Sequence, residues 1–399
     1  MSKTMKNEKQ ALVPRLRFPE FRDAGEWVNE SMGDLYGFYP TNTFSRDKLN
    51  YTKGDVKNIH YGDIHTKFAT LFDVTKELVP FINGTESVER IRPESYCIEG
   101  DVIFADASED MEDVGKSIEI VNTNNEKIVS GLHTILARQL TNRLAIRFGG
   151  YLFKSGAIRE QIKKEAQGAK VLGISSGRLS RIKVCYPSDR EEQQKIADCL
   201  SSLDALITAQ ADKVDTLKTH KKGLMQQLFP REGETVPRLR FPEFRDAGEW
   251  RKCKLEEMAK RGSGHTPNKK YPSYYNGGIK WVSLADSDKL DNGYIFKTKH
   301  EISEEGLKNS SAVLHSPGTV ILSRDAGVGK SGVLHSPMAV SQHFIAWCCE
   351  KSKLSNWFLY YFLQKMKPTF ESIAVGNTIK TIGLSYFKDM MIVVPAIEE

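Results

Sequence analysis

The chain has 399 residues, of which 40% are hydrophobic and 27% are charged, and its formal net charge is +6. This length corresponds to two or three domains, and the composition is that of a globular protein that can build real cores. It excludes a membrane-spanning helix, because no run of about 18 apolar residues occurs. The N-terminal stretch contains lysines but no apolar segment, so we expect no secretory signal.

The positive charge is distributed unevenly along the chain. Residues 28–187 hold 21 Lys and Arg against 21 Asp and Glu, whereas residues 251–395 hold 20 against 12, a balance of +8. A mild basic excess permits nucleic-acid binding but does not demand it. We therefore expect an anionic partner to act more strongly on the second half of the chain.

The six cysteines form no C-x-x-C pair and do not cluster at the spacing of metal ligands. They are Cys97, Cys185, Cys199, Cys253, Cys348 and Cys349. We expect reduced thiols, no metal site and a cytoplasmic protein.

The first predicted element is an irregular arm that recurs later in the chain. Its segment Val13–Trp27 is identical over 15 residues to Val236–Trp250, at an offset of 223. This offset is too long for a solenoid repeat and marks two domain-sized units, each entered through the same arm. Prolines in the arm exclude a continuous helix. Because both copies keep three aromatic residues (Phe18, Phe21 and Trp27 in the first), we interpret the arm as a strap that docks on a neighbouring surface; the alternative is a repeated linker.

Weaker similarities follow in the same order inside each unit. Gly100–Phe104 matches Gly318–Leu322, Val114–Ser117 matches Val328–Ser331, His133 matches His343, Ala166–Gly168 matches Ala374–Gly376, and Lys183–Pro187 matches Met391–Pro395. The offset drifts from 223 to 208, so the second unit is about 15 residues shorter. The two units are predicted to share one fold with diverged surfaces.

A long helix is predicted between the units, over residues 189–229. The segment contains no proline, and acidic residues follow its N-cap. Positions at alternating spacings of four and three form a heptad stripe, which is typical of a coiled-coil seam. The seam residues are Ile196, Leu200, Leu203, Ile207, Gln210, Val214, Leu217, Lys221, Leu224 and Leu228. The alternative is an amphipathic helix that covers a globular core.

The second unit closes on a segment that resembles the start of this helix. Residues 393–399 match residues 184–192, with two residues fewer. We expect residues 396–399 to begin a second, truncated helix. The seam of the first helix would then be unpaired within the chain and open to self-association.

Together these features resemble one family, the specificity subunits of type I restriction–modification systems. The resemblance covers nearly the whole chain. It is carried by the entry R-F-P-E-F…W before each unit, by Pro187 followed by Glu192–Leu200, which reads E-Q-x-x-I-A-x-x-L, and by the helix exit Lys222–Pro230. The expected truncation of the second helix departs from the family, in which two helices pair antiparallel and hold the recognition domains apart.

The resemblance implies a mixed α/β (α+β) fold, with two similar target-recognition domains separated by a long coiled-coil helix. The implied division is 1–27 arm, 28–187 first recognition domain, 188–230 spacer helix, 231–250 repeated arm, 251–395 second recognition domain and 396–399 start of the truncated helix.

The role that the resemblance implies is non-catalytic. Each domain would read one half of a split double-stranded DNA target. The chain would carry two modification subunits, which methylate adenine with S-adenosylmethionine, and two restriction subunits, which use ATP and Mg²⁺. The chain itself would bind no cofactor.

The residues themselves also predict no active site. The chain lacks the Pro-Pro of an adenine methyltransferase motif. Gly327–Ser331 looks like a phosphate loop, but Arg324 stands where the loop needs its first glycine, so we expect a turn between two strands. His133 and His343 recur, yet no carboxylate recurs with them at matching positions, and we interpret both as core or supporting histidines. The acidic stretch 106–113 is interpreted as a solvated loop.

DNA contacts are predicted on loops and helix ends that combine cations with polar groups. The clearest candidate is the segment 269–278, which mixes lysines, tyrosines and glycines. The predicted DNA-binding residues are Lys57, His60, Lys67, Lys116, Ser175, Ser176 and Arg178 in the first unit, and Lys269, Lys270, Tyr274, Lys280, Arg324, Lys330, Thr378 and Lys380 in the second. The competing hypothesis is a coiled-coil scaffold that binds proteins and has no DNA specificity of its own.

Overall fold

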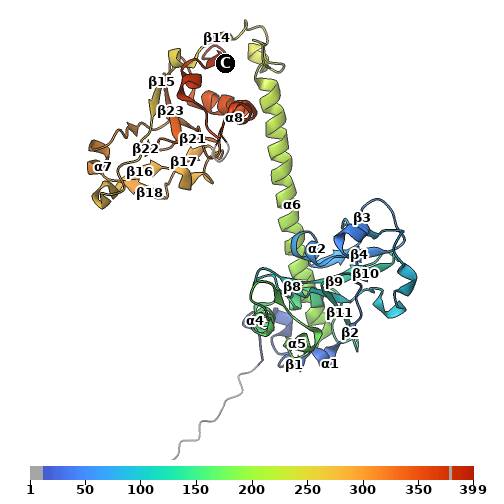
Figure 1. Cartoon of the computed structure of the whole chain (residues 1–399). Coiled ribbons are helices and arrows are strands. Elements are labelled where there is room, and N and C mark those ends of the chain that lie inside the picture. Colours follow the sequence, from blue (N-terminus) through green and yellow to red (C-terminus); the bar gives the residue numbers. More distant parts are fainter. Residues whose placement is uncertain (1–11, 377–379) are drawn as a thin grey trace, which may run out of the picture. The chain divides into compact units, whose positions relative to one another are not determined.

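The computed structural model describes residues 12–376 and 380–399, and the chain divides into two compact units, Met1–Gln210 and Ala211–Glu399 (Figure 1). Both units are mixed α/β, and a long helix passes from one to the other, as predicted. Among the described helices, none is long and apolar enough to cross a membrane. Thr378, one of the predicted DNA-binding residues, lies outside the described residues.

Unit 1 is built on a five-stranded sheet with the order β2-β11-β7-β9-β5. Neighbouring strands are antiparallel except β5 and β9, which are parallel. The strands are β2 (Tyr36–Tyr39), β5 (Leu71–Asp73), β7 (Val102–Ala105), β9 (Ser117–Asn122) and β11 (Thr134–Gln139).

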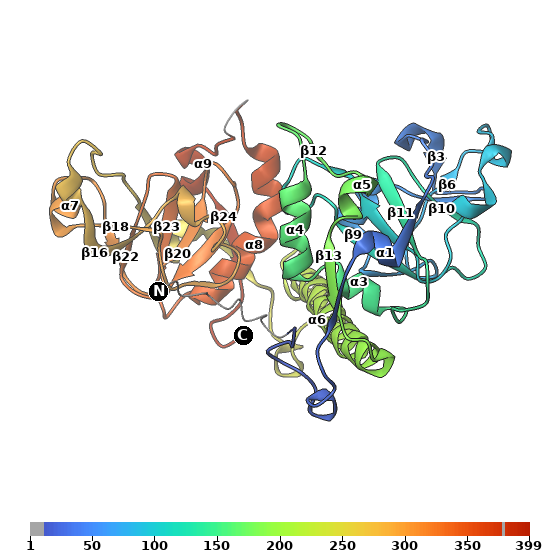
Figure 2. The same cartoon turned by 90° about the horizontal axis from the view of Figure 1, so that it is seen from below.

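A second, four-stranded sheet in unit 1 has the order β10-β4-β6-β3. Its strands are β3 (Leu49–Asn50), β4 (Lys57–Ile59), β6 (Phe81–Ile82) and β10 (Ile128–Ser130). Two strand pairs complete the unit: β1 (Val28–Ser31) with β13 (Lys183–Tyr186), and β8 (Ala107–Ser108) with β12 (Leu172–Gly173). The helices are α1 (Met32–Leu35), α2 (Tyr61–Thr66), α3 (Phe148–Leu152), α4 (Gly156–Glu165) and α5 (Ser176–Leu179). Helix α4 packs beside α5 and β13 (Figure 2).

The core of unit 1 lies on both faces of the five-stranded sheet. Successive side chains of a strand point to opposite faces. On the central strand β7, Val102 and Phe104 therefore enter one buried cluster, and Ile103 and Ala105 enter the other. A sheet buried on both faces explains why this strand is apolar without alternation.

Unit 2 repeats this plan. Its five-stranded sheet has the order β15-β23-β20-β21-β17, and its four-stranded sheet has the order β18-β16-β22-β19. The strands are β14 (Arg251–Lys254), β15 (Ala259–Ser263), β16 (Tyr275–Val282), β17 (Tyr294–Ile295), β18 (His300–Ile302), β19 (Leu314–His315), β20 (Val320–Ser323), β21 (Ser331–Leu334), β22 (Met338–Val340), β23 (Phe344–Cys349) and β24 (Met391–Val394). The predicted match of Gly100–Phe104 with Gly318–Leu322 therefore falls on the central strands of two like sheets.

The helices of unit 2 are α7 (Glu304–Lys308), α8 (Asn356–Ile373) and α9 (Leu384–Lys388). They include one that is longer than any of α1–α5, since α8 has 18 residues and α4 has 10. Short 3₁₀ turns in the two units are η1 (Pro19–Phe21), η2 (Arg46–Lys48), η3 (Val88–Arg90), η4 (Pro93–Ser95), η5 (Pro242–Phe244), η6 (Leu255–Glu257), η7 (Pro272–Tyr274) and η8 (Leu284–Asp286).

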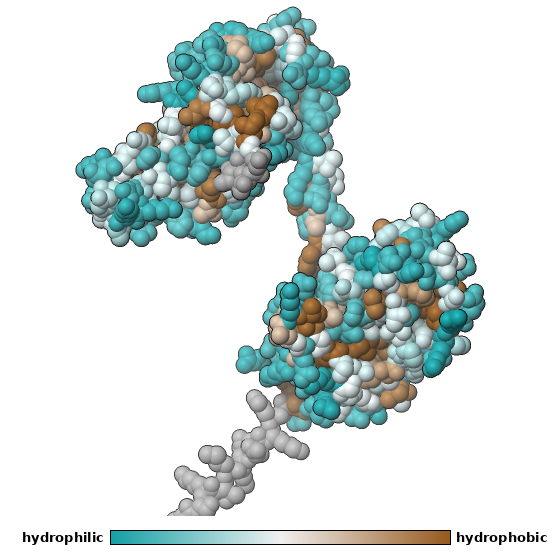
Figure 3. All heavy atoms as spheres, viewed as in Figure 1, coloured by the Kyte–Doolittle hydropathy of each residue, from teal (hydrophilic) through white to brown (hydrophobic). Residues whose placement is uncertain are grey.

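The long helix α6 (Arg190–Leu228) confirms the helix predicted over 189–229. Its 39 residues correspond to about 58 Å at 1.5 Å per residue. Its first turns are buried against unit 1, and its last residue packs on the core of unit 2. Between them the predicted seam is exposed: Leu203, Ile207 and Leu217 are 49%, 66% and 56% exposed. Figure 3 shows apolar side chains at the surface along this helix. The pairing of the seam stays a prediction.

Both arms dock on a glutamate, which confirms the interpretation of a strap. Glu192, in the first turn of α6, accepts hydrogen bonds from Arg17 (2.7 and 2.6 Å) and from the indole of Trp27 (3.3 Å). Glu399 forms an ion pair with Arg240 (2.9 Å) and accepts a hydrogen bond from the indole of Trp250 (3.2 Å). The two ends that the sequence matched, at residues 192 and 399, therefore make the same contacts.

Candidate nucleic-acid interface

In each unit the ends of two parallel strands bring two loops together. In unit 1, β4 and β10 lead into α2 and into the turn before β11; in unit 2, β16 and β22 lead into η8 and into the turn before β23. Parallel strands end at the same edge of a sheet, so the loops meet there. We call this surface the turn face. It comprises residues 60–67, 106 and 131–133 in unit 1 and residues 283–289, 325 and 341–343 in unit 2.

A fully buried aspartate lies under each turn face. In unit 1, Asp63 accepts hydrogen bonds from Arg46 (2.7 and 3.0 Å) and forms an ion pair with Lys67 (2.9 Å). In unit 2, Asp286 accepts from Lys289 (2.6 Å) and from the backbone N–H of Lys299 (2.7 Å). Burial opposes ionisation of Asp63, but the hydrogen bonds from Arg46 and Lys67 outweigh it and lower the pKa of the carboxyl group. Each aspartate thus fixes cations at the rim of its turn face.

The recurring histidines belong to the turn faces and not to the core, so of the two interpretations offered for them the core histidine was wrong, and the supporting histidine remains. His133 lies 3.3 Å from Asp106, and His343 lies 3.0 Å from Asp325, in each case between Nδ1 and a carboxylate oxygen. The side chain of His133 is 51% exposed and that of His343 is 30% exposed.

The sequence comparison missed the two carboxylates because their positions in the aligned units differ by one residue. The backbone N–H of Asp106 donates to the carbonyl of His133, whereas the residue that does this in unit 2 is Arg324, one position before Asp325. A strand register was therefore needed to identify the repeated histidine–aspartate pair.

The recurring lysines of the glycine-lysine-serine turns hold the turn faces together. The Nζ of Lys116 donates to the carbonyl of His65 (2.7 Å), and the Nζ of Lys330 donates to the carbonyl of Ser287 (3.3 Å). The turn Gly327–Lys330 connects β20 and β21, as predicted. Each predicted phosphate-binding lysine is thus engaged by its own unit.

The structure brings only part of the predicted unit 1 set to the turn face. His60 caps α2 by accepting from the backbone N–H of Gly62 (3.1 Å), and Lys67 is half-exposed beside it. Lys57 lies at the opposite end of β4, in an ion pair with Glu126 (2.6 Å).

Ser175, Ser176 and Arg178 lie at α5, which follows the strand β12. Both serines are exposed, and the guanidinium of Arg178 donates to the carbonyl of Glu165 (2.8 Å). The segment is tied to the turn face, because the backbone N–H of Ile174 donates to the carbonyl of Asp106 (2.9 Å).

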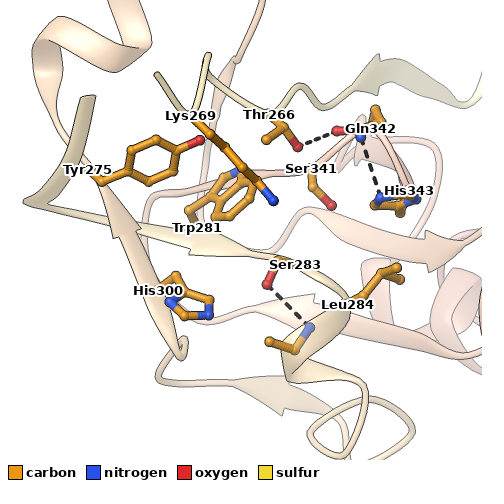
Figure 4. A pocket seen from close by; sticks show the side chains of 11 residues that line it. Thr266, Lys269, Tyr275, Trp281, Ser283, Leu284, His300, Ser341, Gln342 and His343 are labelled. Carbon is orange, nitrogen blue, oxygen red and sulfur yellow. Dashed lines mark hydrogen bonds between the residues drawn. The ribbon is translucent and has the colours of Figure 1, made fainter. Parts of the chain in front are cut away.

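In unit 2, a cavity of about 590 Å³ opens on the turn face (Figure 4). The predicted residue Lys269 lines this cavity together with Thr266, Tyr275, Trp281, Ser283, Leu284, Ala285, His300, Ser341, Gln342 and His343. Its neighbour Lys270 is exposed, and the ring of Tyr274 packs on that of Tyr271 (5.0 Å between centroids).

The other predicted residues of unit 2 that the structure describes do not line this cavity. The Nζ of Lys280 donates to the carbonyl of Phe296 (2.8 Å), and the guanidinium of Arg324 donates to the carbonyl of Ile382 (3.2 Å). Lys380 is exposed just before the segment that pairs with Arg324.

Several polar residues of the turn faces were not predicted. In unit 1 these are Asp63, which is held by Arg46 of η2, and Tyr61, whose ring lies 4.7 Å from that of His60 and 5.3 Å from that of His133. In unit 2 they include Gln342, which is exposed beside His343. For Tyr61, Asp63 and Gln342 the signal in the sequence was position alone, since each lies within four residues of the end of β4 or β22.

The described residues contain no group of three or more His, Cys, Asp or Glu that could hold a metal ion. In the part of the chain that the structure describes, the turn faces therefore offer hydrogen-bonding groups, cations and aromatic rings, which are the groups that contact DNA.

Comparison with known proteins gives a consistent result. The family model described as the type I restriction modification DNA specificity domain matches residues 26–219 and 247–399. A putative type I restriction enzyme MjaX specificity subunit from Methanocaldococcus jannaschii is 24% identical, over 89% of this chain and 79% of its own length.

Two solved structures have a similar fold. The S subunit of a type I restriction-modification system from M. genitalium gives a TM-score of 0.56 at 12% identity, covering 94% of this chain and 86% of its own. A chain from a structure of type I R-M complex assembly and conformational transition gives 0.55 at 18% identity, covering 96% and 88%.

Proposed function

The chain belongs to the family of type I restriction modification DNA specificity domains, and from this we propose that its two units read the two halves of one split DNA target. The chain is a DNA-recognition subunit, and its matched relative is named a specificity subunit and not a nuclease or methyltransferase. The scaffold hypothesis without DNA specificity is not favoured.

The observation that carries the proposal is the repeated turn face with different side chains. Both units keep a buried aspartate, a histidine–aspartate pair and a lysine that ties the loops together. At the exposed ends of the same loops the side chains differ, with Leu132 in unit 1 where unit 2 has Gln342. Contacts to phosphates set the register, whereas contacts to base edges carry the sequence information. Two domains that recognise different half-sites need the same supporting contacts but different side chains at the exposed ends of the loops.

The proposed partners follow from this role. Double-stranded DNA would lie across the turn faces, and the exposed apolar stripe of α6 would be available to protein. We propose two modification subunits and two restriction subunits as partners, with S-adenosylmethionine, ATP and Mg²⁺ used by these subunits. No residue of this chain is assigned to any of these cofactors.

The experiment is to co-express the chain with modification subunits and to sequence the DNA with detection of modified bases. The proposal expects a methylated motif in two parts, separated by a spacer of fixed length. A purified, intact complex that methylates no defined motif would contradict it.

A further inference from the structure

Gln342 occupies an exposed place in the turn between β22 and β23 of unit 2. It lies at the cavity of the turn face, and Lys269 and Ser283 line the same cavity (Figure 4). The elements around it are fixed by the sheets, because the backbone N–H of Ser341 donates to the carbonyl of Val282 (2.9 Å). The side-chain amide is therefore presented from a rigid base.

A chain of four polar side chains orients this amide. The hydroxyl of Thr266 donates to Oε1 of Gln342, and Nε2 of Gln342 lies 3.4 Å from Nε2 of His343. Nδ1 of His343 lies 3.0 Å from the carboxylate of Asp325.

The carboxylate of Asp325 accepts only, so the proton of the neutral His343 ring lies on Nδ1 and leaves Nε2 as an acceptor. The amide nitrogen of Gln342 is then the group that donates to Nε2, and the oxygen faces Thr266. His343 thus assigns the two ends of the amide, because the Thr266 hydroxyl can either donate or accept. Each end keeps one free hydrogen-bonding site: one N–H on the nitrogen and one lone pair on the oxygen.

We propose that Gln342 reads an adenine in the half-site of unit 2, an inference that rests on the proposed function. An amide that donates and accepts side by side matches the edge of adenine in the major groove, which offers N7 as acceptor and the N6 amino group as donor. Guanine offers two acceptors at the same edge. The amide oxygen is also an acceptor, so it cannot form a hydrogen bond with guanine there. Thr266, His343 and Asp325 are positioning residues that reduce the entropy lost when the amide binds.

The amide of Gln342 is not among the features that unit 1 and unit 2 have in common. Unit 1 keeps the histidine–aspartate pair, His133 with Asp106, but has Leu132 before the histidine. A leucine neither donates nor accepts a hydrogen bond. The adenine contact is therefore a property of unit 2 alone.

The test uses the full chain in complex with modification subunits, and modified-base sequencing measures the recognised motif. Gln342→Leu copies unit 1 and should relax one adenine position of one half-site, with discrimination lowered about 5- to 150-fold. All other positions of the motif should be unchanged. Gln342→Glu should favour cytosine at that position, because a carboxylate accepts from the cytosine amino group. Thr266→Val should cause a smaller loss at the same position.

The matched control is Gln226→Leu, the same change at an exposed position of α6, which should leave the motif unchanged. The inference is overturned if the Gln342→Leu complex keeps full adenine discrimination, or if methylation falls equally at every sequence. A wild-type complex without any motif would instead refute the proposed function itself.

Discussion

Asp63 holds two cations at the turn face of unit 1, and the substitution Asp63→Asn tests how much this stabilises the unit. The side chain is 1% exposed and pairs with both Arg46 and Lys67. Asparagine keeps the shape but removes the charge. Loss of one partner from a buried ion pair costs about 3–5 kcal/mol. Because Arg46 and Lys67 are 43% and 51% exposed and can turn to water, we expect about 2–3 kcal/mol, near the value of a charged hydrogen bond.

The assay is urea unfolding of the full chain, with hydrogen–deuterium exchange to separate the two units. The pKa of Asp63 is lowered in the folded state from 3.8, so its stabilisation is complete above that value and is lost as the pH falls through the folded pKa. The difference between wild type and variant should therefore be largest near pH 7 and should narrow below about pH 4. Asp286→Asn is the matched control and should act on unit 2 alone.

Equal free energies of unfolding for unit 1 at pH 7 would refute this reasoning. So would a difference between wild type and variant that stays constant down to pH 2, because it would not depend on the carboxylate charge.

Three further outcomes are expected. Lys269→Ala should weaken binding to all DNA sequences alike and reduce the slope of log K against log salt by about 1, measured by titration at several salt concentrations; a change in sequence preference would contradict this. The isolated wild-type chain should form a concentration-dependent dimer in sedimentation, and Leu203→Asp should abolish it. Monomers in both the wild type and the variant would contradict the self-association hypothesis. Burial raises the pKa of Glu119 to about 7, so the free energy of unfolding should fall as the pH rises from 4.5 through 7, and Glu119→Gln should lack this fall; parallel pH profiles would argue against it.

Sequence reasoning recovered the features whose signal is local or repeated. The 15-residue identity identified two units, and the matched segments Gly100–Phe104 and Gly318–Leu322 fall on equivalent strands, which the structure shows to be central. The spacing of apolar residues identified α6, because a stripe on one side of a helix is readable without a partner. The match of residue 192 with residue 399 reappears as two glutamates, each held by its own copy of the arm.

The turn faces were less predictable, since they depend on strand register. The carboxylates of the histidine–aspartate pairs are one position apart in the two units, so a comparison of identical positions missed them. Asp63 and Asp286 follow strands that were not recognised from the sequence. Charge alone favoured Lys57, which lies at the far end of β4 from the turn face. Residue type predicted a DNA-binding surface but not which end of a strand carries it.

The central claim is that each unit reads its own half of the target. The most direct measurement replaces residues 251–395 by the second unit of another family member and determines the methylated motif of the assembled complex. The account predicts that one half of the motif changes while the other half is kept. A hybrid in which both halves change, or neither does, would contradict it.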